Sequence, residues 1–180
     1  MEQLNSTDVL NVFAQYGFQK TSMSDIARAA GVSRQSLYNN FKSKDEIFEF
    51  VIRAYVEKLY EEAVSALTTN DGSVIEKLIK AYAIWIGSSV SLLHSTPHGA
   101  ELLERGIQAH LKNSMDIEEQ FAERIKVFIT DHKLARDSSV ETEDIVYTLT
   151  MSAKGLLLKS LSEDDFRAGI QKIIKTLLVA

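Results

Sequence analysis

Residues 33–41 carry polar side chains of the kinds that read the edges of DNA bases. When they are placed at 100° per residue on a helix, Leu37 and Phe41 share one face, and Gln35 and Asn39 lie nearly opposite it. Glutamine and asparagine pair with adenine in the major groove of DNA, and arginine pairs with guanine. The pattern therefore predicts a base-reading helix face made by Arg34, Gln35, Ser36 and Asn39.

Charge is distributed unevenly along the chain. The 180 residues carry a net charge of −5 and have a pI near 5.4, which on average argues against nucleic acid. Residues 20–44 nevertheless hold five basic residues against Asp25 alone, a local net charge of +4. An acidic body would repel a DNA duplex and leave the basic segment free to dock. On composition alone, 33–41 could still be only an exposed amphipathic helix.

The elements that must position these side chains are helices. One proline, eight glycines and apolar residues every three or four positions predict an all-α protein. Helix starts are indicated where a Ser precedes an acidic residue by three positions, at Ser22, Ser43, Ser73, Ser138 and Ser162, and by Thr96 before Pro97. We expect nine helices: 6–16, 22–30, 33–40, 43–68, 73–94, 96–112, 114–134, 138–160 and 162–179.

The first three helices form a small N-terminal module. Gly17 ends the first helix and lets Phe18 fold back on Phe13, and Gly31 ends the second helix. Ser33 caps the third helix after a tight turn, which is a helix-turn-helix arrangement. We therefore divide the chain into a DNA-binding domain at 1–42 and a second domain at 43–180.

Three stretches of this module resemble the DNA-binding domain of the tetracycline-repressor-like (TetR) family of bacterial regulators. They are the run from Phe13 to Ala27, the turn from Ala30 to Ser33, and the segment from Leu37 to Lys44, within a match over about residues 9–50. At Asn39-Asn40 the chain departs from the family, which often has an aromatic residue followed by histidine there.

The resemblance implies a dimer whose recognition helices enter the major groove of a palindromic operator, a double-stranded DNA partner. It also implies phosphate contacts, which position the protein without specifying sequence. These contacts fall on Thr21, Ser22, Ser33, Tyr38, Asn40, Lys42 and Lys44.

Residues 45–180 carry no family motif, and the resemblance implies a six-helix bundle for ligand binding and dimerisation. In the family the last two helices pair with their twofold mates, and here both have wide apolar faces. The expected homodimer interface comprises Leu149, Leu156, Phe166, Ile170, Ile173 and Leu177. The alternative is that these are ordinary intramolecular core helices.

A pocket for an unidentified small-molecule effector is expected among the middle helices. The candidate lining residues are Tyr55, Tyr82, Trp85, Gln108, His110, Phe121, Phe128 and Tyr147. Core packing is the alternative for each, because any bundle core contains aromatic residues at helical spacing. Trp85 and Tyr82 are the most suggestive, since a buried polar tip needs a partner.

Other classes of function find no support in the sequence. The absence of cysteine removes thiolate nucleophiles, cysteine-ligated zinc and disulfides. Thr96-Pro97 interrupts the pair His94 and His98, and no hydrolytic or nucleotide-binding motif occurs, so we expect no metal, no cofactor and no enzyme. Without a membrane span or a signal peptide, we expect a cytoplasmic protein with no membrane partner.

The sequence thus predicts a dimeric transcriptional regulator, most often a repressor in this family, that a small molecule releases from its operator. One alternative is a regulator without a small-molecule inducer, controlled by a protein partner. Another, from a different class, is a helical ligand-binding or scaffold protein whose DNA-binding module is degenerate.

Overall fold

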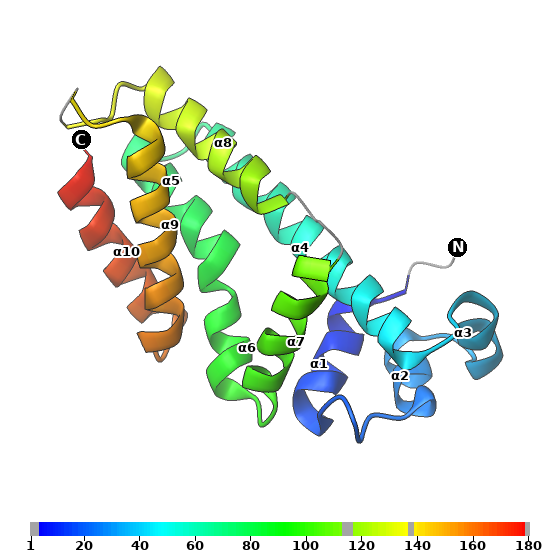
Figure 1. Cartoon of the computed structure of the whole chain (residues 1–180). Coiled ribbons are helices and arrows are strands. Elements are labelled where there is room, and N and C mark those ends of the chain that lie inside the picture. Colours follow the sequence, from blue (N-terminus) through cyan, green and yellow to red (C-terminus); the bar gives the residue numbers. More distant parts are fainter. Residues whose placement is uncertain (1–3, 113–116, 137–138, 179–180) are drawn as a thin grey trace. The chain divides into compact units, whose positions relative to one another are not determined.

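The computed structural model describes residues 4–112, 117–136 and 139–178, and the regular elements within them are helices (Figure 1). In chain order these are α1 (Ser6–Tyr16), α2 (Met23–Ala30), α3 (Arg34–Asn40), α4 (Lys44–Thr68), α5 (Val74–Tyr82), the π-helical segment η1 (Ala83–Gly87), α6 (Ser89–Ser95), α7 (Gly99–Lys112), α8 (Ile117–Asp131), α9 (Thr142–Lys159) and α10 (Glu163–Leu177). The prediction of an all-α protein is confirmed. None of the described helices has the length and apolar character needed to cross a membrane.

The chain forms two compact units whose boundaries differ from the predicted division at residue 42. One unit comprises Met1–Lys58 together with Leu92–Met115, and the other comprises Leu59–Ser91 together with Asp116–Ala180. Helix α7 therefore belongs to the same unit as α1, α2 and α3. The sequence placed it with the remaining C-terminal helices.

Most of the predicted helix starts are confirmed. Ser22 with Asp25, and Ser73 with Glu76, form reciprocal capping boxes, in which each side chain accepts a hydrogen bond from the other residue's backbone N–H. Ser43 and Ser162 also accept from the backbone N–H three residues on. These caps satisfy backbone donors that a helix start leaves unpaired.

Two predicted starts are wrong. Helix α9 begins at Thr142 after Glu141, which makes no side-chain cap, and Ser138 lies outside the described residues. Helix α7 begins at Gly99, three residues later than the Thr96-Pro97 pair suggested. Gly99 lies so close to α6 that a Cβ there would stand 2.0 Å from the carbonyl oxygen of Leu92.

The predicted helix 73–94 is divided in the structure into α5, η1 and α6. The backbone stays helical at Tyr82 and Ser88, on either side of the π-helical turn. Within that turn Gly87 packs against α10, where an added Cβ would lie 2.7 Å from Cδ1 of Phe166. π-helical turns of this kind occur often at functional sites.

Three phenylalanines form the centre of the first unit's core. The ring of Phe18 stacks on Phe13 at 5.6 Å between centroids, which confirms the predicted fold-back, and Phe48 lies edge-on to both rings at 5.4 and 5.5 Å. Leu37 of α3 and Leu102 of α7 belong to the same buried cluster. Burying each large apolar side chain contributes about 1.5–3 kcal/mol, so this cluster fixes α2 and α3 on the helices around them.

The second unit is built from α5, η1, α8, α9 and α10 with the end of α4, and α9 and α10 run side by side (Figure 1). Tyr82, Phe121 and Phe166 are among its fully buried side chains. The hydroxyl of Tyr82 pairs with Oγ1 of Thr150 at 3.3 Å, which satisfies two buried polar groups. Burial raises the pKa of Tyr82 far above its ordinary value.

Candidate nucleic-acid interface

The turn between α2 and α3 has the geometry that its sequence predicts. Gly31 adopts the left-handed conformation with φ of 71°, and the N–H of Val32 donates to the carbonyl of Ala27 at 3.0 Å. Ser33 then begins α3, because its Oγ accepts from the N–H of Ser36 at 3.0 Å. Since glycine takes positive φ without strain, Gly31 can end α2 and lead into the turn before α3.

Helix α3 is anchored by one face and exposes the opposite one. Leu37 is 1% exposed, and Phe41, directly after α3, packs edge-on against Phe50 of α4 at 5.4 Å. Gln35 and Asn39 are exposed on the outer face, and Nε2 of Gln35 donates to Oδ1 of Asn39 at 2.9 Å. The remaining donors and acceptors of this pair face outward, where a base edge could meet them.

Arg34 and Tyr38 add a guanidinium and a phenol to the exposed side of α3. Tyr38 is 51% exposed although it is aromatic, so most of its ring is available to a partner. Together with Gln35 and Asn39, these side chains make up the surface that we name the α3 face.

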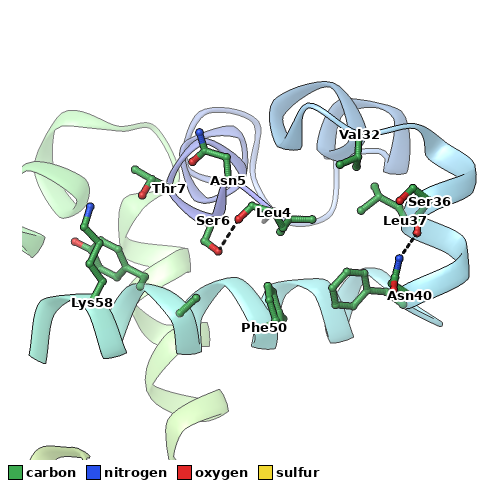
Figure 2. A pocket seen from close by; sticks show the side chains of 13 residues that line it. Leu4, Asn5, Ser6, Thr7, Val32, Ser36, Leu37, Asn40, Phe50 and Lys58 are labelled. Carbon is green, nitrogen blue, oxygen red and sulfur yellow. Dashed lines mark hydrogen bonds between the residues drawn. The ribbon is translucent and has the colours of Figure 1, made fainter. Parts of the chain in front are cut away.

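Ser36 and Asn40 border a groove beside the α3 face. The side-chain amide of Asn40 donates to the carbonyl of Ser36 at 2.7 Å (Figure 2). The groove has a volume of about 710 Å³ and is lined by Leu4, Asn5, Ser6, Thr7, Val32, Ser36, Leu37, Asn40, Phe41, Phe50, Ala54, Tyr55 and Lys58. Figure 2 shows that the start of α1, α3 and α4 supply its walls. Of the predicted effector-binding residues, Tyr55 lies here.

Two predicted phosphate contacts face inward. Thr21 is 2% exposed, and its hydroxyl donates to the carbonyl of Gly17 at 2.7 Å. Nζ of Lys44 donates to the carbonyls of Phe18, Gln19 and Thr21 at 2.6, 3.0 and 2.9 Å. An ammonium group has three N–H donors, so all of them are already used. Thr21 and Lys44 therefore stabilise the turn before α2 and do not present their side chains to a phosphate.

The other predicted phosphate contacts lie at the surface. Tyr38, Asn40 and Lys42 are exposed. Ser22 and Ser33 are exposed too, but both hydroxyls serve as helix caps. Their caps hold the starts of α2 and α3 in place, and helix starts attract anions.

A local ion pair moderates the charge of α2. Arg28 lies 3.0 Å from Oδ1 of Asp25. Hydrogen bonds from the side chain and backbone of Ser22, more than the charge of Arg28, hold the pKa of Asp25 below its ordinary value. Asp25 therefore stays ionised, and the net positive charge of this surface depends on Lys20, Arg34 and Lys42, which are all exposed.

The predicted effector residues are divided between the two units: Tyr55 and Gln108 belong to the first, and Tyr82, Trp85, Phe121, Phe128 and Tyr147 to the second. In the second unit, the ring of Phe121 lies edge-on to Tyr82 at 5.5 Å and stacks on Trp85 at 5.0 Å. These three rings fill space against one another, and Phe128 is buried beside the ring of His132 at 4.4 Å.

Two other members of that predicted set are at the surface. Gln108 is exposed, and Tyr147 is 65% exposed, so neither belongs to an enclosed lining. The side chain of His110 lies outside the described residues.

Half of the predicted dimer residues are core residues of the single chain. Leu149, Phe166 and Ile170 are 0% exposed, so they cannot offer a surface to a second copy. Leu156, Ile173 and Leu177 are half-buried. The apolar side chains that are exposed in this region are instead Tyr147, Met151, Leu158 and Leu161.

The exposed apolar side chains of α9 have a sequence signal that the predicted dimer interface does not include. Tyr147, Met151 and Leu158 fall within about 40° of one another at 100° per residue, on the side of α9 opposite Leu149.

Among the described residues, no three His, Asp or Glu side chains gather as a metal site would need.

Comparison with known proteins supports the resemblance of the N-terminal helices. Residues 10–51 match the profile of the family described as bacterial regulatory proteins, tetR family. The chain is 39% identical over 67 residues to the HTH-type transcriptional repressor KstR2 of Mycolicibacterium smegmatis, which covers 37% of this chain and 32% of that protein. Three matches to curated regulators, of which KstR2 is one, span only 53%, 25% and 32% of the regulators' own lengths.

Solved structures extend the similarity in fold to nearly the whole chain. A transcriptional regulator from Rhodococcus sp. Rha1 superposes with a TM-score of 0.70 at 16% identity, covering 96% of this chain and 92% of that one. A transcriptional regulator from Saccharomonospora viridis, solved in complex with choline, gives 0.64 at 17% identity and covers 97% and 96%. Residues 10–51 of this chain therefore resemble the tetR family of bacterial regulatory proteins, and the chain as a whole shares its fold with solved transcriptional regulators.

Proposed function

We propose that the protein is a transcriptional regulator that binds a palindromic operator as a homodimer through α2 and α3. The observation that carries this proposal is the α3 face, where Gln35 and Asn39 are exposed and mutually oriented while Leu37 anchors the opposite side. A short helix held in this way presents amide and guanidinium groups at fixed positions. Such groups discriminate base pairs in the major groove.

Phosphate contacts would come from the edges of this surface. Tyr38 and Lys42, which precede and follow Asn39 and Asn40 in the sequence, are exposed. The start of α2 belongs to the same compact unit as α3. Each phosphate neutralised by a cation releases counterions, so affinity should fall as salt rises. These contacts set the register of the protein on DNA, and the α3 face then reads the sequence.

Dimerisation is proposed through the exposed apolar side chains of α9. Tyr147, Met151 and Leu158 would be covered by a second copy, since large apolar patches on soluble proteins mark contact sites. Gly155 adds open space on the same helix, where a Cβ would meet no atom within 4 Å. A twofold interface of this kind would match the symmetry of a palindromic operator.

Repression and release by a small molecule complete the proposal. The similar KstR2 protein is described as a repressor, and the similar regulator from Saccharomonospora viridis was solved with choline. An effector that prefers one arrangement of the second unit would shift the population away from the DNA-binding form. Trp85 is the natural reporter, because it is the chain's one tryptophan and stacks on Phe121 at 5.0 Å.

A regulator controlled by a protein partner is the second candidate. The mutual packing of Tyr82, Trp85 and Phe121 favours it, because these rings act as core and not as a lining. Titration with choline and with a panel of small organic cations, followed by Trp85 emission, separates the two candidates. A saturable change that also lowers DNA affinity supports an effector, and an unchanged spectrum favours the protein partner.

The proposal is tested by selecting duplexes from a random pool with the wild-type protein. Affinity for the selected duplex and for a random-sequence duplex is then measured by fluorescence anisotropy at several salt concentrations. We expect a palindromic consensus, tighter binding to the selected duplex and a linear fall of log affinity with log salt. No enrichment together with no salt-dependent binding would refute DNA binding.

A further inference from the structure

The ring of Phe18, in the turn between α1 and α2, lies against two cations from distant parts of the sequence. Nζ of Lys44 is 4.7 Å from its centroid, and Cζ of Arg105 is 4.0 Å away. Phe18 is 4% exposed, so both cations contact a ring that is largely removed from water. Cations within about 6 Å of an aromatic centroid are attracted to its face.

From the side of α4, Lys44 holds the backbone of this turn. Its three hydrogen bonds go to the carbonyls of Phe18, Gln19 and Thr21. The carbonyl of Gly17 accepts from both the N–H and the hydroxyl of Thr21, at 3.1 and 2.7 Å. The carbonyls of Gly17, Phe18, Gln19 and Thr21 in this turn are thus all paired.

From the side of α7, His98 holds the end of α1. Its backbone N–H donates to the carbonyl of Ala14 at 3.0 Å, which satisfies an acceptor at the helix end. Its imidazole lies so close to Gly17 that a Cβ there would stand 2.9 Å from the ring. The contact with α7 therefore depends on a glycine at the first position of the turn.

Glu101 joins His98 to Arg105 along α7. One carboxylate oxygen lies 3.2 Å from Nδ1 of His98, and the other lies 3.4 Å from Nε of Arg105. All three side chains are about one-third exposed, at 33%, 35% and 34%. Glu101 orients the guanidinium, and the guanidinium lies over Phe18.

We propose that Arg105, oriented by Glu101, is a positioning residue for DNA binding: it fixes the turn of residues 17–21 and thereby the start of α2. Ser22 caps α2 directly after this turn, so a displacement of Phe18 moves the helix start with it. The inference rests on the proposed DNA-binding function. It adds α7 to the elements on which phosphate contact depends, whereas the sequence placed α7 outside the DNA-binding domain.

The central variant is Arg105→Met, which keeps an unbranched side chain and removes the cation. Arg105→Lys keeps a cation over the ring, and Arg124→Met removes an exposed arginine of α8 in the other unit as a matched control. Binding to the selected duplex and to the random-sequence duplex is measured for each. Hydrogen exchange at the amide of Thr21 is followed without DNA, because that N–H bonds to Gly17 within the turn.

We expect Arg105→Met to weaken both duplexes by the same factor, about three- to tenfold, because one cation–π contact is lost and phosphate contacts carry no sequence information. Exchange at Thr21 should become faster. Arg105→Lys should restore most of the affinity, and Arg124→Met should match the wild type. Thermal unfolding monitors the fold, and Glu101→Gln offers a milder second variant that should weaken binding in the same direction.

Two results would overturn the inference. One is wild-type affinity and wild-type exchange in Arg105→Met, and the other is a loss confined to the selected duplex, which would place Arg105 in base reading. Failure of the proposed function looks different, because the wild type itself would then bind neither duplex. Exchange at Thr21 would still show whether Arg105 holds the turn.

Discussion

The side-chain amide of Gln35 donates a hydrogen bond to the side-chain carbonyl of Asn39, one helical turn further along α3, at 2.9 Å. The bond uses one N–H of Gln35, and the other N–H and the carbonyl oxygen of Gln35 and both N–H groups of Asn39 belong to exposed side chains. It also orients both amides, which would lower the conformational entropy lost if they meet a base pair as proposed.

Gln35→Ala should relax sequence preference more than it lowers overall affinity. A bidentate amide contact discriminates between bases by about 1–3 kcal/mol, and Asn39 would lose its orienting partner at the same time. The check is a comparison of affinities for the selected duplex and its single-base variants. A uniform loss across all duplexes would contradict a base-reading role for Gln35.

Lys42→Met and Lys44→Met should behave differently although they are neighbours in sequence. Lys42 is exposed, so its loss should lower the slope of log affinity against log salt by about one and leave the melting temperature nearly unchanged. Lys44 bonds to three carbonyls, so its loss should cost about 1–3 kcal/mol of unfolding free energy. Thermal unfolding and anisotropy on the same samples distinguish them. An unchanged melting temperature for Lys44→Met would contradict the structural role.

Gly17→Ala should be more destabilising than Gly31→Ala. At Gly31 a Cβ meets no atom within 4 Å, so the cost is about 1 kcal/mol for the left-handed backbone alone. At Gly17 the φ of 79° and ψ of 153° belong to a region almost restricted to glycine, and the Cβ also overlaps His98. We expect a loss of at least about 2 kcal/mol there. Denaturant unfolding of both variants measures the two losses of unfolding free energy. Equal losses would contradict the expected difference.

Leu158→Asp should convert a dimer to a monomer. Leu158 is 68% exposed in the single chain, so a carboxylate there costs little in the monomer but would be buried in the proposed interface. Val127→Asp, at a 46% exposed apolar position of α8, is the matched control. Light scattering at micromolar concentration gives the mass. A wild-type monomer, or a dimer that Leu158→Asp leaves intact, would refute this interface.

Acid should destabilise the start of α2 through Asp25. Its folded-state pKa is lowered from the ordinary 3.8, mainly by the hydrogen bonds of Ser22, so the carboxylate stabilises the fold above about pH 4. That contribution is lost as the pH falls through the lowered folded-state value. Asp25→Asn and Ser22→Ala should therefore lose less stability than the wild type between pH 5 and pH 2, as thermal unfolding would show. The same pH dependence of the melting temperature in all three proteins would contradict this role of Asp25.

The features predicted correctly from the sequence are local ones. The capping box of Ser22 with Asp25 joins residues three apart, and the stacking of Phe18 on Phe13 joins residues five apart. The polarity of the α3 face follows from helical spacing in the same way. Such contacts depend on short stretches whose geometry the helix and its caps already fix.

The features that sequence did not predict depend on long-range packing. The family resemblance implies a phosphate contact for Lys44, but the acceptors of its ammonium group lie 23 to 26 residues earlier in the chain. Arg105 reaches Phe18 across an even longer separation. Likewise, helical spacing places Leu149 and Tyr147 on opposite sides of α9, but only the packed structure shows that the first is buried and the second exposed.

The tight contact at Gly99 has a consequence for genetics. Because a Cβ at this position would stand 2.0 Å from the carbonyl oxygen of Leu92, every replacement must displace main-chain atoms. In a saturation mutagenesis screen for loss of regulation, substitutions at Gly99 should therefore be as harmful as substitutions at a base-reading residue. Its intolerance would report the steric requirement of the bend before α7, and a map of essential positions would need that correction before it was read as an operator contact map.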